Sequence, residues 1–226
     1  MARKRSKIQI TRFLVQLVFM ASLIFSLGFI PGTRNVSTWL LPTVLLAGVF
    51  FCGWVCPFGA AQDWMSKLGR LLHLPRLRMP ERAQRYLQLL RYAFYLVSTT
   101  GITFALLKGP HNFSRFMRGD FLSIASGFII VFLMISLFFD RPFCNYFCTG
   151  GARSGLFSVL RIFGIKRDTQ QCRQCGQCSK ACPMNIDVAR TEFVRHPNCI
   201  GCMNCVSSCP KDFLKYRLMP PATKRK

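Results

Sequence analysis

The chain has 226 residues, which is room for one or two domains. Its formal net charge is +23, from 31 Lys and Arg against 8 Asp and Glu, yet 51% of its residues are hydrophobic and 22 are Phe. A soluble nucleic-acid-binding domain would account for the charge, and a disordered basic tail would be poor in aromatic residues. Neither class accounts for a mean hydropathy of +0.27 with long uncharged runs, so we expect no nucleic-acid partner.

Four runs without a charged residue predict membrane spans. They contain 21, 28, 16 and 19 residues and cover 13–33, 35–62, 92–107 and 121–139. A bilayer core of about 30 Å needs about 20 apolar residues in a helix, so the first, second and fourth runs are long enough. The third is short, but it continues a helical pattern from Glu81, just after Pro80. We expect four transmembrane helices, the first of them uncleaved; if the third run were a buried soluble helix, three spans would remain and the C-terminal part would be exported.

The distribution of basic residues predicts the orientation of these spans. With the N-terminus inside, segments 1–12, 63–91 and 140–226 carry 27 Lys and Arg, and the two outer loops carry 4. This bias matches the positive-inside rule and accounts for most of the net charge. We therefore expect a multi-pass protein of the bacterial cytoplasmic (inner) membrane, with both termini cytoplasmic and with basic segments near anionic lipid.

The C-terminal region carries a doubled cysteine motif. It reads C-x2-C-x2-C-x3-C-P from Cys172 and again from Cys199. This is the bacterial spacing for two [4Fe–4S] clusters, in which the fourth cysteine of each run binds the other cluster. We therefore assign the ligands to a first ferredoxin group, Cys172, Cys175, Cys178 and Cys209, and to a second ferredoxin group, Cys199, Cys202, Cys205 and Cys182.

Zinc and disulfides account less well for these eight cysteines. A zinc ribbon needs two CxxC pairs and has no use for eight thiolates in this order. Disulfides are disfavoured in a reducing cytoplasm, where the predicted orientation places the region. Residues 165–217 are also too few to bury an adequate core unaided, so bound metal would supply folding energy.

The remaining four cysteines form an internal repeat. FCGWVCPFGA (51–60) and FCNYFCTGGA (143–152) share a Phe, both cysteines, an aromatic residue and a closing Gly-Ala. Parallel repeats of this kind are related by an axis along the membrane normal, which would bring both CxxxC pairs to the inner face. On a helix, residues i and i+4 share a face, so the two pairs predict a third iron–sulfur cluster. Its ligands would be the CxxxC group, Cys52, Cys56, Cys144 and Cys148.

The CxxxC group is also compatible with other chemistry. Structural thiols, a redox-active dithiol pair, or a transient copper or zinc site would use the same residues. The sequence Asp140-Arg141-Pro142 also interrupts the fourth run before its motif, so the two motifs need not lie at the same depth.

These motifs carry a resemblance to known families. The tail, with CPMNIDV after the first motif and CIGCMNC opening the second, looks like a bacterial two-cluster ferredoxin domain. Over residues 5–217 the chain resembles the membrane polyferredoxins, and in particular the NapH-type quinol dehydrogenase membrane subunit of periplasmic nitrate reductase systems. Cys52, Cys56 and Pro57 match the family motif, whereas Thr149 stands where the family usually has Pro.

The expected protein is an α-helical membrane protein with a small C-terminal α+β ferredoxin-like domain. Its parts are a basic N-terminus (1–12), a four-span domain (13–152) and a cytoplasmic two-cluster domain with a basic tail (153–226). The resemblance implies an electron-transfer subunit of a quinol dehydrogenase rather than a complete enzyme, with quinone or quinol as substrate and a redox protein as partner. We assign no catalytic residue. The alternatives are an assembly or metal-reduction factor for a respiratory metalloenzyme and a redox sensor.

Overall fold

A computed structural model describes residues 7–25, 42–99 and 108–218 of the protein. The N-terminal part contains α1 (Lys7–Ile24), a helical stretch at 42–47, α3 (Phe50–Trp54), α4 (Pro57–Leu71) and α5 (Glu81–Thr99). The middle part contains α6 (Gly109–Met117), α7 (Ile124–Ile135), α8 (Pro142–Tyr146) and α9 (Thr149–Ser158). The C-terminal part contains β1 (Phe163–Arg167), α10 (Gln177–Lys180), α11 (Asn204–Ser208) and β2 (Leu214–Leu218).

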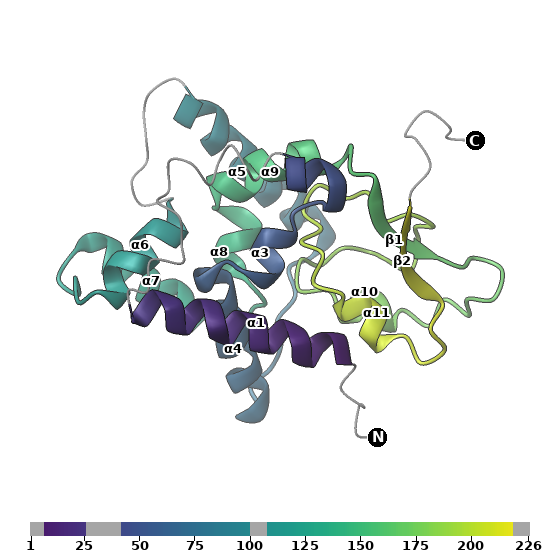
Figure 1. The fold of residues 1–226 in the computed structure, drawn as a ribbon, viewed down its shortest axis with the longest axis horizontal. Coiled ribbons are helices and arrows are strands. Elements are labelled where there is room, and N and C mark those ends of the chain that lie inside the picture. The colour runs from purple at the N-terminus through teal and green to yellow at the C-terminus, as the bar shows by residue number, and fades with distance from the viewer. Residues whose placement is uncertain (1–6, 26–41, 100–107, 219–226) are drawn as a thin grey trace.

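The helices and the sheet occupy opposite ends of the molecule (Figure 1). Helices α6 and α7 lie at one end, and the antiparallel pair of β1 and β2 lies at the other. The strands pair from Phe163 with Leu218 to Arg167 with Leu214. Helix α1 runs along the molecule from the α6 and α7 end to the short helices α10 and α11. The small α+β part expected at the C-terminus is confirmed.

Two hydrophobic cores correspond to these two ends. The helical core is aromatic: Phe58 and Phe143 stack edge to face at 5.1 Å, and Phe132 lies 5.3 Å from Phe143. The C-terminal core combines aliphatic side chains with cysteines, and Cys52 and Trp54 of the helical part pack against it. The second core therefore reaches into the helical part at the first CxxxC motif.

Two of the predicted spans are shorter or more broken in the structure than the sequence suggested. The fourth run, expected as a helix over 121–139, is helical only over Ile124–Ile135, which is about 18 Å of helix. The second run breaks at Gly48, whose φ of +78° ends the helical stretch at 42–47, and again before Cys56. The helix expected from Glu81 is confirmed as α5. Parts of the first three runs lie outside the described residues.

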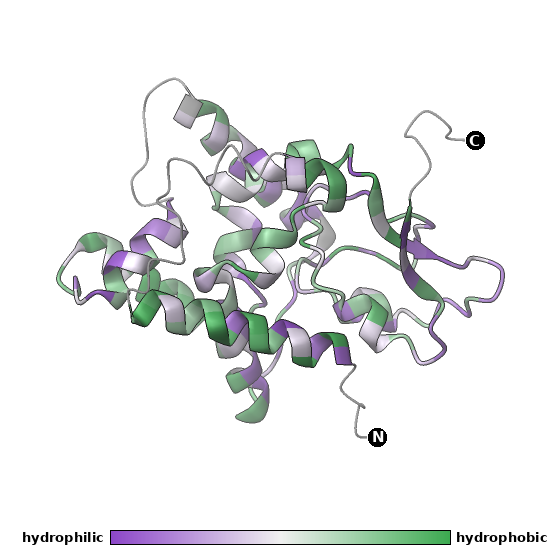
Figure 2. Ribbon diagram, viewed as in Figure 1, coloured by the Kyte–Doolittle hydropathy of each residue, from purple (hydrophilic) through white to green (hydrophobic). Residues whose placement is uncertain are grey.

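The outer surface of the helical end is strongly apolar. Hydrophobic residues cover much of α1 and α7 in Figure 2. Leu122 and Ile124 are 103% and 83% exposed, and Val18 of α1 is 64% exposed. Among the described residues, α1 is the one helix that is long and apolar enough to cross a membrane.

Candidate metal centres

The two CxxxC motifs have the same local structure. In each, the first cysteine is the third residue of a five-residue helix, α3 or α8, and the second is the N-cap of the next helix, α4 or α9. The backbone angles of the N-caps agree closely: φ −61° and ψ 116° at Cys56, φ −67° and ψ 107° at Cys148. The amide of each N-cap donates to the residue five positions earlier, Phe51 or Phe143. The internal repeat read from the sequence is therefore a repeat of structure.

One expectation about these motifs is wrong. The chain leaves helical geometry before Cys56 and Cys148, so neither pair lies on one face of a single helix. The second helix of each motif starts at the cysteine, with Pro57 or Thr149 as its first residue. A short polar or small residue favours an N-cap because it can accept backbone N–H groups, and the Cys148 sulfur accepts from Gly151 at 3.3 Å.

The structure brings the four cysteines of the CxxxC group together. The thiol of Cys52 lies near enough to those of Cys56, Cys144 and Cys148 for their deprotonated forms to repel one another. Cys56 and Cys148 both pack in the aromatic core, and the amide of Gln62 donates to the Cys144 sulfur at 3.3 Å. The four thiols come from the two halves of the internal repeat, and their binding of one common cluster stays a prediction.

The four thiols of the second ferredoxin group line one cavity. It contains about 320 Å³ of space, part of it open to solvent, and its other lining side chains are aliphatic or Met. Burial raises the pKa of Cys182 to about 12, and burial also raises the pKa of Cys205. A deprotonated thiol at these positions needs a nearby cation, which a thiolate-bound metal centre would provide.

The first ferredoxin group is more exposed. Cys172 interacts electrostatically with Cys178, and Cys209 packs against the core that contains Cys178. Cys175 is exposed to solvent. A hydrogen bond from the Arg167 side chain lowers the pKa of Cys172. Across the described parts of the chain, no three His, Cys, Asp or Glu side chains converge closely enough to hold a single metal ion.

A buried charge network, which was not predicted from the sequence, lies between the CxxxC group and the second ferredoxin group. Asp63 is paired with Arg12 and with Arg141, whose Nη2 lies 2.6 Å from the carboxylate. Burial alone would raise the pKa of Asp63, but the two guanidinium groups outweigh it and hold the pKa far below its usual value. Asp63 directly follows the second uncharged run, and Arg141 comes one residue after Asp140, which follows the fourth, so the charges next to the two runs were a signal for the pair.

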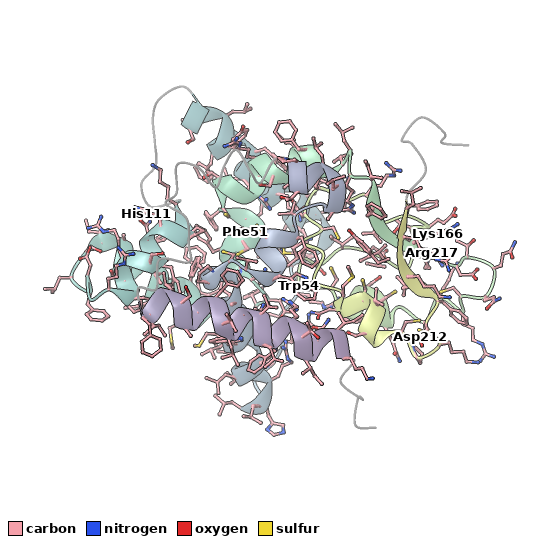
Figure 3. The ribbon with its side chains drawn as sticks, viewed as in Figure 1. Phe51, Trp54, His111, Lys166, Asp212 and Arg217 are labelled. Atoms are coloured by element: carbon pink, nitrogen blue, oxygen red, sulfur yellow. The ribbon has the colours of Figure 1, made fainter. Side chains whose placement is uncertain are left out.

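The C-terminal part docks directly on the first CxxxC motif. The indole N–H of Trp54 donates to the carbonyl of Gly201 at 3.0 Å, and Figure 3 shows Trp54 between the helical end and the sheet end. The Gly53 backbone lies so close that a Cβ added there would be 2.3 Å from the Ile200 carbonyl oxygen. Gln9 of α1 donates to the carbonyl of Cys202 at 3.0 Å. The CxxxC group and the second ferredoxin group are thus neighbours across a tight backbone contact.

This arrangement defines a class of protein with several cysteine-rich metal centres, and comparisons with known proteins identify the family. A model described as a 4Fe–4S binding domain matches residues 36–75 and 121–167, and a 4Fe–4S dicluster domain matches 164–210. The first match covers both CxxxC motifs and the second covers all eight ferredoxin-type cysteines. The chain belongs to the polyferredoxin-like family of 4Fe–4S proteins and resembles its NapH-type members.

Three relatives illustrate the family. The chain is 33% identical to the Escherichia coli (strain K12) electron transport protein YccM, over 88% of this chain and 60% of the relative. It is 33% identical to the uncharacterized Methanocaldococcus jannaschii protein MJ0750, over 76% and 73%. It is 25% identical to the ferredoxin-type protein NapH of Haemophilus influenzae, over 76% and 63%. The chain thus spans less than two thirds of YccM, and no solved structure matches it.

Proposed function

We propose that this chain is a membrane-bound iron–sulfur subunit that passes electrons between the quinol pool and a partner redox protein. The observation that carries the proposal is the gathering of its cysteines: the two CxxxC motifs lie near each other, and the second ferredoxin group lines a cavity next to the first of them. Relatives described as electron transport and ferredoxin-type proteins support the assignment.

The residues fit three iron–sulfur clusters. We assign one to the CxxxC group and one to each ferredoxin group, with Cys182 and Cys209 exchanged between the two ferredoxin motifs. The cavity of the second ferredoxin group supports this exchange, since Cys182 lies in it beside Cys199, Cys202 and Cys205. Each cluster is a one-electron carrier when bound. The chain supplies the thiolates and the surrounding guanidinium groups, and the first ferredoxin group is the most exposed of the three.

The membrane setting is part of the proposal. The exposed apolar faces of α1 and α7 and the 27 to 4 bias of basic residues support a multi-pass protein with both termini in the cytoplasm. We place four spans in residues 13–152, with parts of them outside the described residues, and a cytoplasmic two-cluster domain in 153–226. His111 lies on α6, at the opposite end from Lys166 and Arg217 of the sheet (Figure 3), which agrees with an outer loop and a cytoplasmic domain.

Iron and sulfide analysis of anaerobically purified protein tests the cluster assignment. We expect about twelve iron atoms per chain, and about eight in a Cys52→Ser/Cys144→Ser variant. A Cys199→Ser variant is the matched control, because it should lose the iron of the second ferredoxin group and keep that of the CxxxC group. Equal iron in the unaltered protein and the Cys52→Ser/Cys144→Ser variant would exclude the third cluster.

A redox titration of the same protein, followed by electron paramagnetic resonance, tests the electron-transfer role. Addition of a quinol analogue should reduce the clusters of the unaltered chain. Clusters that stay oxidised with every quinol analogue tested would contradict the link to the quinol pool and favour an assembly factor or a sensor.

A further inference from the structure

The buried charges of the described residues do not balance. One buried carboxylate, Asp63, is set against five buried arginines, namely Arg12, Arg91, Arg141, Arg161 and Arg167. A buried charge without a counter-charge is strongly unfavourable. Electrostatic interactions with thiols involve four of the five arginines. The excess positive charge is therefore placed where deprotonated cysteines would offset it.

Arg141 is the most enclosed of these arginines. Its side chain has no exposed surface, and its backbone adopts the left-handed conformation, with φ 50° and ψ 54°, directly before Pro142. A bulky residue with positive φ is unfavourable and persists only where the surrounding structure demands it. Here the demand comes from Asp63, because Nε and Nη2 of Arg141 donate to the two carboxylate oxygens, each at 2.6 Å.

The third nitrogen of the same guanidinium, Nη1, contacts the first CxxxC motif. Nη1 of Arg141 donates to the carbonyl of Cys52 at 2.7 Å. Electrostatically, Arg141 interacts with Cys56 and Cys144 of the CxxxC group and also with Cys202 of the second ferredoxin group. One fixed cation thus acts on both groups.

Two neighbouring arginines, Arg12 and Arg91, also lie at the junction. Arg12 interacts with Cys202 and donates to the carbonyl of Gly53 at 2.8 Å. Arg91 interacts with Cys52 and donates to the carbonyl of Cys144 at 3.1 Å. Arg12 also pairs with Asp63, and Arg91 also donates to Asn198 of the C-terminal part at 3.2 Å, so both reach across the junction. Arg141 differs from them in having no exposed side-chain surface and in donating through all three of its guanidinium nitrogens.

We propose that Arg141 is a positioning residue that serves as the shared counter-charge of the CxxxC group and the second ferredoxin group, and that it makes both easier to reduce. The inference rests on the proposed function, since it requires both groups to hold redox centres. Reduction adds one negative charge to a centre, and a fixed positive charge nearby stabilises that state, more strongly in a buried site than in water. Asp63 holds the guanidinium in place and partly offsets its charge.

The test is a redox titration of the cluster-loaded protein, followed by electron paramagnetic resonance. Arg141→Gln removes the charge and keeps a hydrogen-bonding side chain. We expect the reduction constant of both centres to fall about tenfold, which is 59 mV toward negative potential for a one-electron couple. Arg141→Lys should restore most of the shift. Arg115→Gln, which removes one partner of the exposed pair with Asp120, is the control and should shift neither centre.

Unchanged potentials in Arg141→Gln, or a shift in only one centre, would overturn the shared role. If Arg141→Gln does not retain its centres, Asp63→Asn decides the question instead. Loss of that negative charge should shift both potentials toward positive values, and the absence of a shift would overturn the inference. Absence of any CxxxC signal in the unaltered protein is a different result, because it refutes the three-cluster assignment on which the inference rests.

Discussion

Replacement of Gly53 by Ala tests the contact between the helical part and the C-terminal part. Gly53 is buried in the first CxxxC motif, and a Cβ there would lie 2.3 Å from the carbonyl oxygen of Ile200 and 3.5 Å from the amide of Cys202. Ordinary contact between such atoms begins above 3 Å, so one backbone must move by nearly 1 Å. Neither is a flexible side chain, so the strain has no easy release.

Overpacking of this kind costs about 1–3 kcal/mol. For a chain of this size, 1 kcal/mol lowers the melting temperature by about 2–4 °C, so we expect Gly53→Ala to melt several degrees lower. The hydrogen bond from Trp54 to Gly201 lies in the same contact and should weaken with it. Intrinsic tryptophan fluorescence during thermal unfolding in detergent is the measurement.

Gly127→Ala is the matched control. Gly127 lies within α7 and has nothing within 4 Å of its added Cβ. Ala is favoured over Gly in a helix by about 0.5–1 kcal/mol, so this variant should melt at the same temperature or higher. Equal melting temperatures for Gly53→Ala and Gly127→Ala would refute the close docking of the two parts.

Three further predictions concern charge, topology and electron delivery. The pKa of Asp63 is lower in the folded protein than in the unfolded chain, where it is about 4, so the stabilisation from its charge is complete above pH 4 and is lost as the pH falls below that value. The difference in unfolding free energy between the unaltered protein and Asp63→Asn should therefore be constant from pH 5 to 8 and shrink in acid. A difference that grows in acid would contradict the ion pair. Reporter fusions after Lys226 and at Lys67 should be cytoplasmic and one at Asn112 external, and an exported C-terminus would mean that the third run is not a span. Cys175→Ser should abolish electron delivery to the partner without loss of membrane insertion, as measured by quinol-dependent acceptor reduction and membrane fractionation; undiminished delivery would exclude the first ferredoxin group from the route.

The sequence by itself determined the chemistry of the metal centres. Cysteine spacing is a local property, and the doubled motif from Cys172 and Cys199 indicated 4Fe–4S binding, which the family matches confirm. The repeat around Cys52 and Cys144 was also readable, because two copies of one local structure need similar local sequences. Hydropathy indicated apolar helices, but it could not locate their ends: one helical stretch ends at Gly48 and α7 ends at Ile135, and no charged residue marks either position.

Only the tertiary structure decided which groups are neighbours. Arg141 and Asp63 are 78 residues apart, and Trp54 and Gly201 are 147 apart, so no local pattern could pair them. Hydrophobic burial favours the docking of the C-terminal part on the first CxxxC motif, but the side on which it docks depends on the absence of a side chain at Gly53. The buried guanidinium groups of Arg12 and Arg141 follow the same logic, since each meets the Asp63 carboxylate from a distant part of the chain.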